Sequence, residues 1–488
     1  MNAAMRPGLS LNDILQVEDD EAVLAVTCPH TDIPLWALLR VPLLRSILSD
    51  ALYSVPLVGQ AAATPRIRAA SSLARAVLHD ALRAGASRAE VLVMATGVGQ
   101  QLQEGRWFNR LSDHFANALP RQTLVIEDFF GWRWPFPRHN SRVRFSAPGQ
   151  AAAAIFGKLA CDATDHACAA RLVGLVADRA RRTLGWELPI AQADFLRGWL
   201  ARKAAAVPWL YRRHRAMLER TGARVLIKEE ACYGGTSAVL MRAARDLGIA
   251  TAEYQHGAIS GGHDAYNVAP ALQHSDAYRR TLPEHLLAYG SWWVDQIGMP
   301  VQGVAIGNPH RAARLAGSGI RNEPSGEVLI LGDGLETPMY MALAERLAAR
   351  VAGRLRVVFR PHPLEREAVR AKYGSGNSAV GIDPHVDIYD ALRASHAVVS
   401  ELSTGLFEAV GLVDHVFIWD TPKSRFTFPS HPFTAFQDAD DLAMQLEHNT
   451  ASACSVADVD AIWQPDWRTH YLQFLSRVGS VDVNLSNT

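Results

Sequence analysis

Short apolar runs alternate with helix-compatible stretches along most of the chain, and this alternation most constrains the fold. The apolar runs are too short for helices, and the segments between them carry apolar residues at helical spacing. Strands that alternate with helices predict a parallel sheet packed between helices. We expect strands at residues 23–27, 91–95, 123–126, 225–227, 249–254, 286–289 and 304–306, and again at 328–331, 355–359, 397–400 and 416–419.

The alternation stops at residues 311–326 and then restarts, which divides the chain into two halves. This segment, RAARLAGSGIRNEPSG, is polar and contains glycine and proline, as linkers do. A chain of 488 residues also exceeds the usual size of one core. We predict an α/β protein with two Rossmann-like domains facing across a cleft. The first domain would span 1–310 with a helical insertion near 151–220, the second 327–455, and a helix in 456–488 would cross back to the first.

Three segments outside the sheets carry further expectations. Residues 34–52 are interrupted by arginines and a proline, so we expect an amphipathic helix on a domain surface. Residues 129–136 hold five aromatic side chains, which we interpret as a hydrophobic plug under the insertion or, alternatively, as a platform for an acceptor. In the last helix, Trp463, Trp467 and Tyr471 predict burial against the first domain.

The composition argues against several classes of protein. Lys+Arg and Asp+Glu both total 49, so the chain lacks the positive excess of a nucleic-acid-binding protein. Its five cysteines are widely spread and form no C-x-x-C pair, which favours neither a disulfide framework nor a zinc site. The N-terminus lacks the apolar core of a signal peptide, and no run reaches the roughly 18 apolar residues of a membrane helix. We expect a cytoplasmic protein, and peripheral contact with the inner face of the cytoplasmic membrane stays open.

The stretch from Ile249 to His263, IATAEYQHGAISGGH, gives the first candidate site. Its apolar run ends at Tyr254, so Gln255, His256 and Gly257 should lie at the carboxyl edge of the sheet. Open α/β sheets bind their ligands at that edge. An imidazole with the ordinary pKa near 6.5 suits the removal of a hydroxyl proton, so His256 is a candidate general base.

Other residues compete with His256 or support it. The alternative bases are carboxylates that also follow strands, namely Glu127, Asp128, Glu229 and Glu230. Each of these residues would more ordinarily be a surface charge, and His256 itself could be a buried structural histidine. His263 and Asp264 follow in the glycine-rich turn and could support His256 from behind.

In the second half, Arg360-Pro361-His362-Pro363 follows a strand directly. The two prolines fix the backbone, so Arg360 and His362 are presented rigidly at the sheet edge. A guanidinium suits bidentate binding of a phosphate, and an imidazole can donate to a phosphate oxygen. We predict that both residues bind the phosphates of a nucleotide.

A second turn in this half, SELSTG, joins a strand to a helix and offers free N–H groups with two hydroxyls. We predict that Ser403 and Thr404 hold phosphate while Glu408 reaches ribose hydroxyls. Ordinary capping of the helix is the alternative. A third glycine turn adds Gly332, Asp333 and Gly334 to the predicted nucleotide site.

Taken together, these motifs carry a resemblance over residues 224–419. Q-H-G after a strand, R-P-H-P and S-x-x-S-T-G-x-x-E-A resemble bacterial GT-B-type transferases of capsule and lipopolysaccharide synthesis, including sialyltransferase-like and Kdo-transferase-like enzymes. They are also similar to CDP-glycerol glycerophosphotransferases of teichoic acid synthesis. In the sialyltransferase-like groups an H-P pair and an S-S/T pair contact CMP, which implies that role for His362-Pro363 and Ser403-Thr404.

The resemblance implies two different bases. The sialyltransferase-like groups use an acidic pair followed by glycine, whereas Glu229-Glu230 is followed by Ala231. In the glycerophosphotransferases the base is the histidine of a W-H-G motif, and here Gln255 stands in place of the tryptophan before His256. The base is therefore His256 or one of the carboxylates.

The resemblance implies a metal-independent glycosyltransferase. It would move a sugar from a nucleotide-activated donor, with a CMP-sugar favoured, to a hydroxyl of a growing surface polysaccharide or glycolipid. The nucleotide sugar would be a co-substrate rather than a cofactor, and the acceptor would be a saccharide or a lipid-linked saccharide. The alternatives are a CDP-glycerol-type glycerophosphotransferase and a catalytically idle nucleotide-sugar-binding subunit of a polysaccharide assembly complex.

Overall fold

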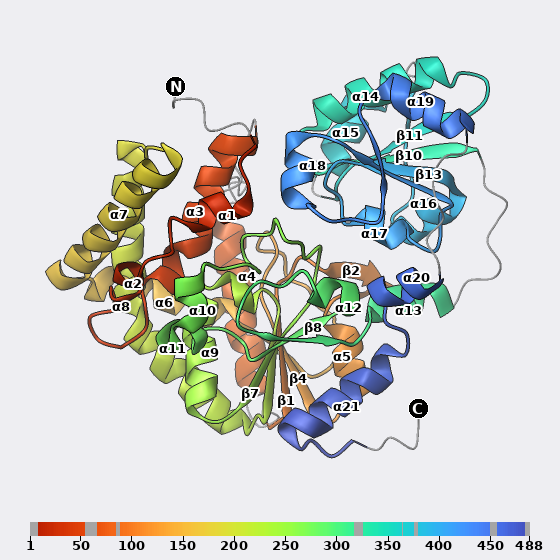
Figure 1. The fold of residues 1–488 in the computed structure, drawn as a ribbon. Coiled ribbons are helices and arrows are strands. Elements are labelled where there is room, and N and C mark those ends of the chain that lie inside the picture. Colours follow the sequence, from red (N-terminus) through yellow and green to blue (C-terminus); the bar gives the residue numbers. More distant parts are fainter. Residues whose placement is uncertain are drawn as a thin grey trace.

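The computed structural model describes residues 8–53, 66–83, 88–316, 326–363, 365–374, 379–448 and 456–483. These residues form two parallel sheets packed between helices, and a two-stranded antiparallel hairpin (Figure 1). The predicted α/β class with two Rossmann-like domains is confirmed. Figure 1 shows the domains as separate lobes whose sheets lie one above the other.

The first sheet has seven strands in the order β5-β4-β1-β6-β7-β8-β9. They are β1 (Val91–Ala95), β4 (Thr123–Glu127), β5 (Val143–Phe145), β6 (Val225–Lys228), β7 (Ala250–Tyr254), β8 (His285–Ala288) and β9 (Gln302–Ala305). The hairpin strands β2 (Gln100–Gln103) and β3 (Arg106–Asn109) lie outside this sheet. Because the neighbouring strands pair in parallel, the residues that follow β4, β6 and β7 share one edge.

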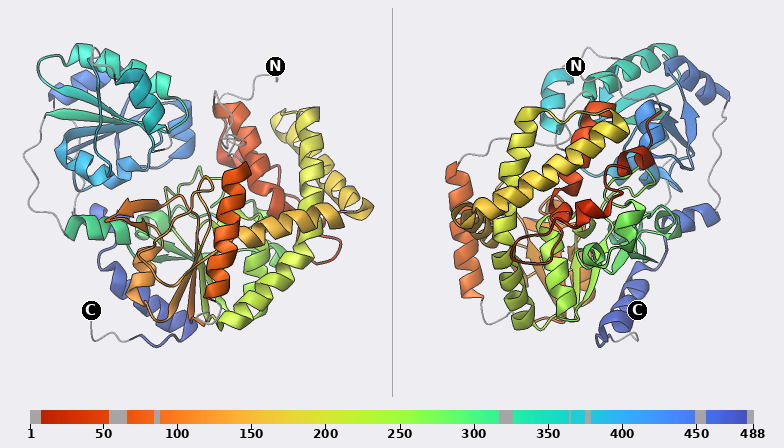
Figure 2. Two further views of the ribbon diagram at one scale, coloured as in Figure 1. Left: turned by 180° about the vertical axis from the view of Figure 1, so that it is seen from behind. Right: turned by 60° about the vertical axis from the view of Figure 1, so that its left-hand side comes forward.

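The helices of the first domain surround this sheet. They are α4 (Arg66–Leu82), α5 (Asp113–Ala118), α9 (Thr236–Asp246), α10 (Pro270–His274), α11 (Asp276–Arg279), α12 (Ser291–Val294) and the short 3₁₀ helix η2 (Ala231–Tyr233). The predicted helical insertion follows β5 as α6 (Ala147–Ala160), α7 (Ala163–Leu184) and α8 (Ile190–Thr221). Figure 2 shows α7 and α8 projecting from one side of the domain. Asp162 caps α7, and Gly185 ends it in the left-handed conformation.

Two expectations for the N-terminal region were wrong. Residues 23–27 form no strand, because Asp20 caps the helix α2 (Glu21–Leu24) through the N–H of Ala22. The helix α3 (Trp36–Leu52), which follows α1 (Leu11–Leu15) and α2, is buried on most of its surface rather than exposed. Its Arg40 is compensated by an ion pair of 2.6 Å with Glu18.

The aromatic stretch 129–136 packs against α4 and β5 rather than under the insertion. The rings of Phe129 and Trp134 lie 5.2 and 4.8 Å from the ring of Phe145. His79 of α4 contacts the same cluster. Phe129 and Trp134 are therefore half-buried side chains that pack on the edge of the core, whereas Phe136 is exposed.

The second sheet has six strands in the order β12-β11-β10-β13-β14-β15. They are β10 (Glu327–Leu331), β11 (Arg356–Arg360), β12 (Gly381–Ile382), β13 (Ser395–Ser400), β14 (His415–Trp419) and β15 (Thr434–Phe436). One face packs on α14 (Thr337–Arg350), α15 (Arg366–Tyr373) and α19 (Ala439–His448). The other packs on α16 (Ile388–Ala394), α17 (Gly405–Ala409) and α18 (Pro422–Thr427).

The chain returns to the first domain after the second sheet. The helix α13 (Pro309–Ala316) occupies the start of the predicted linker, and residues 317–325 of that linker lie outside the described residues. The helices α20 (Val456–Ile462) and α21 (Trp467–Gly479) lead back, and α21 lies against the first domain (Figure 1). Of the aromatic residues predicted to be buried, Tyr471 is fully buried in the first core, Trp463 is buried at the domain interface, and Trp467 is half-buried.

Two further sequence expectations concern cysteines and membrane helices. The described cysteines Cys28, Cys161, Cys168 and Cys232 are free thiols. Among the helices that the structure describes, none combines the length and apolar character needed to cross a membrane.

Candidate active site

The two domains enclose a cavity of about 360 Å³ at the carboxyl edges of their sheets. The first domain contributes α3 and η2, with Arg45, Tyr53, Tyr233, and the loop after β7, with His256, Gly257, Ser260, His263 and Asp264. The second domain contributes Leu402, Thr404, Phe426 and Phe428. The predicted base and part of the predicted nucleotide site therefore face the same space.

His256 lies between two carboxylates. Its Nε2 is 3.8 Å from Oε1 of Glu230, and its Nδ1 is 3.8 Å from Oε1 of Glu253. Both distances exceed hydrogen-bond length. The Nδ1 atom is buried and has no hydrogen-bond partner among the described residues. With 17% of its side chain exposed, the imidazole can reach the cavity while most of it stays shielded from solvent.

Glu253 was not predicted as a functional residue. It is fully buried in β7, and its carboxylate accepts hydrogen bonds from the N–H of Cys232 at 2.6 Å and the hydroxyl of Tyr266 at 2.7 Å. Burial raises the pKa of Glu253, and the neighbouring His256 opposes this rise. A fixed carboxylate behind an imidazole stabilises the imidazolium that forms when the ring accepts a proton. The signal in the sequence was a charged residue inside an otherwise apolar strand.

Glu230 occupies an unusual backbone conformation. Its φ of +58° lies in the left-handed region, which non-glycine residues rarely adopt. Such strain tends to be kept at functional sites. The side chain of Glu230 is 40% exposed beside His256. Glu230 therefore lies beside the imidazole of His256, although it does not line the cavity itself.

Glu229 has a different environment from Glu230. It is buried, and its oxygens accept hydrogen bonds from the N–H and the hydroxyl of Thr96 at 2.7 and 2.8 Å and from the hydroxyl of Tyr254 at 2.9 Å. These bonds tie together the ends of β1, β6 and β7. We assign Glu229 to holding the sheet edge and not to the reaction.

The remaining carboxylates that were candidate bases also have structural partners. Glu127 is buried, accepts from Nδ2 of Asn109 at 2.7 Å and lies 3.5 Å from Arg138. Asp128 accepts from Nε2 of Gln150 at 2.7 Å. Neither Glu127 nor Asp128 lines the interdomain cavity.

The residues predicted to support His256 hold its loop in place. The Nδ1 of His263 accepts from the N–H of Ala265 at 3.1 Å, and its Nε2 lies 3.2 Å from the hydroxyl of Tyr233. Burial lowers the pKa of His263 to about 4, so the ring is neutral at physiological pH. Asp264 is buried, 3.4 Å from Arg45. These contacts order the cavity wall.

Gln255 and Gly257 complete the loop. The side chain of Gln255 donates to the carbonyl of Gly257 at 2.8 Å and accepts from the N–H of Tyr289 at 2.7 Å. An added Cβ on Gly257 would lie 3.9 Å from Oγ1 of Thr404, so the loop approaches the second domain closely here. Gln255 and Gly257 therefore hold the backbone on either side of His256 in place.

The glycine-rich turn is a contact between the domains. The N–H of Ala258 donates to Oγ1 of Thr404 at 3.3 Å. A Cβ on Gly262 would overlap the carbonyl oxygen of Phe426 at the end of α18. The domains are thus in contact directly beside His256.

The predicted nucleotide-binding turns lie side by side, because β11, β10 and β13 are neighbours in the second sheet. The ring of His362 packs over Gly334, where an added Cβ would lie 2.9 Å from the imidazole Cγ. The Oγ of Ser403 accepts from the N–H of Gly405 at 3.1 Å. The structure therefore brings Gly334, His362, Ser403 and Thr404 to one edge.

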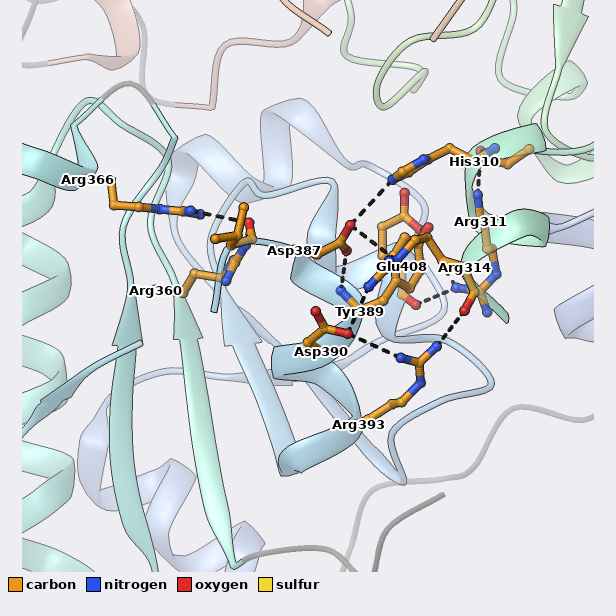
Figure 3. Close-up of polar contacts among 12 residues, drawn as sticks. His310, Arg311, Arg314, Arg360, Arg366, Asp387, Tyr389, Asp390, Arg393 and Glu408 are labelled. Carbon is orange, nitrogen blue, oxygen red and sulfur yellow. Dashed lines mark hydrogen bonds and ion pairs between the residues drawn. The ribbon is translucent and has the colours of Figure 1, made fainter. Parts of the chain in front are cut away.

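Arg360 and Glu408 have other partners (Figure 3). The guanidinium of Arg360 forms an ion pair with Asp383 and donates to the carbonyls of His385 at 3.0 Å and Val386 at 3.1 Å. These contacts fix the loop after β12, so Arg360 has a structural role where we predicted phosphate binding.

Glu408 faces the domain interface instead of a ribose site. Its carboxylate accepts from the hydroxyl of Tyr389 and lies 3.7 Å from Arg311 of α13. Arg311 also donates to the carbonyls of Glu408 at 2.6 Å and Val410 at 2.8 Å (Figure 3). Glu408 therefore takes part in joining α13 to α17.

The turn at Asp333 is acidic. Carboxylate oxygens of Asp333, Glu336 and Glu401 lie within 4.8 Å of one another, and the ammonium of Lys423 contacts Glu336 and lies 3.0 Å from Glu401. Burial raises the pKa of Asp333, and it raises that of Glu401 to about 7. A phosphate placed against Gly332 would meet this negative charge. The predicted phosphate-binding role of the turn is therefore disfavoured.

Arg110, which sequence reasoning missed, is a cation on the opposite side of the cleft. It follows β3 and lines a small recess with Gln255, Tyr289 and Asn308. Burial lowers the pKa of His362, and the positive charge of Arg110 contributes to this lowering, which places the two residues near each other. No ion pair joins Arg110 to a carboxylate among the described residues. Arg110 lies in no recognisable motif, so nothing in the sequence pointed to it.

Comparison with known proteins identifies neighbours in structure only. No protein-family model and no curated protein matches the chain. A UDP-GlcNAc 2-epimerase from Methanocaldococcus jannaschii shares 10% identity over 79% of this chain and 99% of its own, with a TM-score of 0.43. UGT2 of Phytolacca americana, in complex with UDP-2-fluoro-glucose and pterostilbene, shares 12% identity over 82% of this chain and 97% of its own, with a TM-score of 0.39. At this similarity, function has to be argued from the chain's own geometry.

Proposed function

We propose that this chain is a nucleotide-sugar-dependent glycosyltransferase that acts in the cavity between its domains. It would transfer the sugar to a hydroxyl of a growing surface polysaccharide or glycolipid, at the inner face of the cytoplasmic membrane. The motifs that resemble sialyltransferase-like enzymes favour a CMP-sugar as donor. The observation that carries the proposal is the position of His256, between two carboxylates and opposite Thr404.

In this mechanism His256 removes the proton from the acceptor hydroxyl as that oxygen attacks the anomeric carbon. Glu253 stabilises the resulting imidazolium and fixes the ring from behind. The bond from the anomeric carbon to the phosphate oxygen breaks, and the nucleotide leaves with the electron pair. Contact between the domains beside His256 excludes water, which limits hydrolysis of the donor.

The leaving phosphate needs positive charge or hydrogen-bond donors. The structure offers His362 and the hydroxyls of Ser403 and Thr404 on the second domain, and Arg110 on the first. We therefore place the phosphates between Arg110 and His362, away from the acidic turn at Asp333. The nucleotide would occupy the edge of the second sheet.

A panel of activated sugars tests this function. The purified chain is mixed with CMP-, CDP-, UDP- and GDP-linked sugars, and release of the free nucleotide is followed by chromatography. We expect turnover of one class, preferably the CMP-sugars, and weaker donor binding by calorimetry in Arg110→Gln. The proposal fails if no donor binds or is turned over.

A second candidate function is a nucleotide-sugar-binding subunit without turnover. It is favoured by the engagement of Arg360 and Glu408 in structural contacts, which leaves fewer groups for catalysis. Such a subunit would bind one donor in the same calorimetric panel and release no nucleotide, with or without added acceptor.

A further inference from the structure

A second and larger cavity, of about 580 Å³, lies within the first domain between the helical insertion and the sheet. Its walls come from α6 and α8 on one side, and from the ends of β1, β4 and β6 with the start of α9 on the other. None of its lining residues lines the interdomain cavity. Its volume falls in the range of small-molecule sites, roughly 300–1,000 Å³.

The lining of this cavity combines apolar walls with positive charge. The apolar part includes Met94, Ile126, Trp199, Leu210, Met217 and Leu240. The cationic part consists of Arg144, Arg202, Lys203, Arg213, Arg220 and Lys228. Asp80 is the carboxylate in the lining, and it contacts His79 at 2.9 Å and accepts from the N–H of Phe145 at 3.2 Å.

Most of the positive charge in the cavity has no carboxylate partner. Among the described residues, no ion pair joins Arg202, Lys203, Arg213, Arg220 or Lys228 to a carboxylate. Burial lowers the pKa of Lys203 and of Arg213, and the charge of Arg220 lowers that of Arg213 further. Arg213 and Arg220 lie two turns apart on α8, and like charges on one helix face at a cavity wall favour the entry of an anion.

Several of these cations are held in place by contacts that leave their charge unpaired. The guanidinium of Arg213 lies 5.4 Å from the ring of Trp209, and a Cβ on Gly149 would approach its Nη2 to 2.6 Å. The ammonium of Lys203 lies 5.7 Å from the ring of Trp199. These contacts orient both cations at the cavity wall.

A polar atom in the same cavity also lacks a partner. The Nε2 of His214 is buried without a hydrogen bond among the described residues. Burial lowers the pKa of His214 to about 4, and the charges of Arg213 and Lys228 contribute, so the ring is neutral at physiological pH. A neutral imidazole can donate a hydrogen bond to an anion. A bound anion would therefore satisfy a group that the fold leaves unsatisfied.

We propose that this cavity binds an anionic amphiphile, with a phosphate or carboxylate beside Arg213, Lys228 and His214 and an apolar chain along the wall of Met94, Leu210 and Leu240. An inorganic anion would leave the apolar wall unfilled, and a neutral lipid would leave the cations unpaired. This inference goes beyond the proposed transfer reaction, because binding here requires neither a donor nor His256.

Calorimetry with dodecyl phosphate below its micelle concentration tests the inference, with dodecyl maltoside and inorganic phosphate as the comparison ligands. We expect dodecyl phosphate to bind at least tenfold more tightly than either, because only it uses both halves of the cavity. If dodecyl maltoside bound as tightly as dodecyl phosphate, the proposal that the ligand is an anion would be wrong. If inorganic phosphate bound as tightly as dodecyl phosphate, the proposal that the ligand carries an apolar chain would be wrong.

Substitutions of residues that line the cavity test whether dodecyl phosphate binds there. The double variant Arg213→Gln with Lys228→Gln should weaken dodecyl phosphate binding by roughly tenfold or more. Gly149→Ala should weaken it less, since the added methyl displaces the Arg213 guanidinium but keeps its charge. The matched control, Arg182→Gln with Arg212→Gln, removes two exposed arginines of the same insertion that do not line the cavity and should change nothing.

Unchanged affinity in the Arg213 and Lys228 double variant would refute the assignment, provided that its circular dichroism and Tm match those of the wild type. A double variant that fails this folding check is replaced by the single variant Arg213→Gln, whose unchanged affinity would refute the assignment in the same way. His256→Ala should bind dodecyl phosphate normally even if it abolishes turnover. Failure of the transfer proposal and failure of this one are therefore distinguishable.

Discussion

At the scale of single residues, Glu253 shows that an apolar run in a sequence can contain a buried charged side chain with a role in the site. Within IATAEYQHG the glutamate interrupts an apolar run, and the run was interpreted as an ordinary buried strand. The structure shows that Glu253 is fully buried behind His256. The sequence placed His256 at the sheet edge because a strand end can be recognised locally. It could not separate Glu229 from Glu230, because their difference depends on Thr96 and on a left-handed backbone.

Replacing Glu253 by glutamine removes one negative charge while keeping a similar shape. We expect Glu253→Gln to lower kcat at least about tenfold, a change of about 1.4 kcal/mol in the activation free energy, with KM for the donor little changed. Tyr266→Phe keeps the charge and should lose less activity. An unchanged kcat in Glu253→Gln would contradict the role of Glu253.

Glu127 makes stability depend on pH. Burial raises its pKa to about 7, so the folded chain holds a proton that the unfolded chain releases. This contribution to stability is present below about pH 4.5, the ordinary value for glutamate, and is lost as the pH rises to about 7. Glu127→Gln should lose less stability than the wild type between about pH 5 and pH 7.5, by on the order of 1–3 kcal/mol. Urea unfolding at the two pH values measures this, and parallel losses in both proteins would contradict it.

At the scale of elements, the strands and the glycine turns differ in how far sequence predicts them. The strand positions could be predicted because short apolar runs are a local signal. The role of the turn at 259–263 could not be predicted from the sequence. Gly262 leaves room for the carbonyl of Phe426, which lies in the other domain. Likewise, R-P-H-P predicts a rigid turn but not that Arg360 would be engaged by Asp383.

Adding a methyl group at Gly262 should keep the domains apart. A Cβ there would overlap the Phe426 carbonyl, and backbone cannot move aside as a flexible side chain can. We expect Gly262→Ala to increase the radius of gyration in small-angle X-ray scattering and to lower turnover roughly tenfold or more, since closure excludes water and assembles the site. Gly174→Ala, with open space around its Cα, is the matched control. Unchanged scattering and turnover in Gly262→Ala would show that this contact does not limit closure.

At the scale of the whole molecule, the two-domain architecture could be predicted because the strand–helix alternation restarts after the linker. The chemistry of the cleft could not, since it depends on which side chains meet across the domains. His256 and Thr404, which are 148 positions apart, line one cavity. Arg110 lies near His362 although no motif links them. The acidic cluster at Asp333 likewise forms only when the ends of β10 and β13 come together with Lys423 of α18.

The central claim is that His256 acts as the base in the interdomain cavity, and its most direct test compares turnover with donor affinity in His256→Gln. The donor selected in the nucleotide-sugar panel is used for both measurements, with release of the nucleotide followed over time and binding followed by calorimetry. We predict that turnover falls by on the order of 10²–10⁴-fold while the donor Kd stays within about twofold, because the imidazole contacts the acceptor oxygen and not the nucleotide. Full turnover by His256→Gln, with Glu230→Gln inactive instead, would contradict the claim and assign the base to the carboxylate.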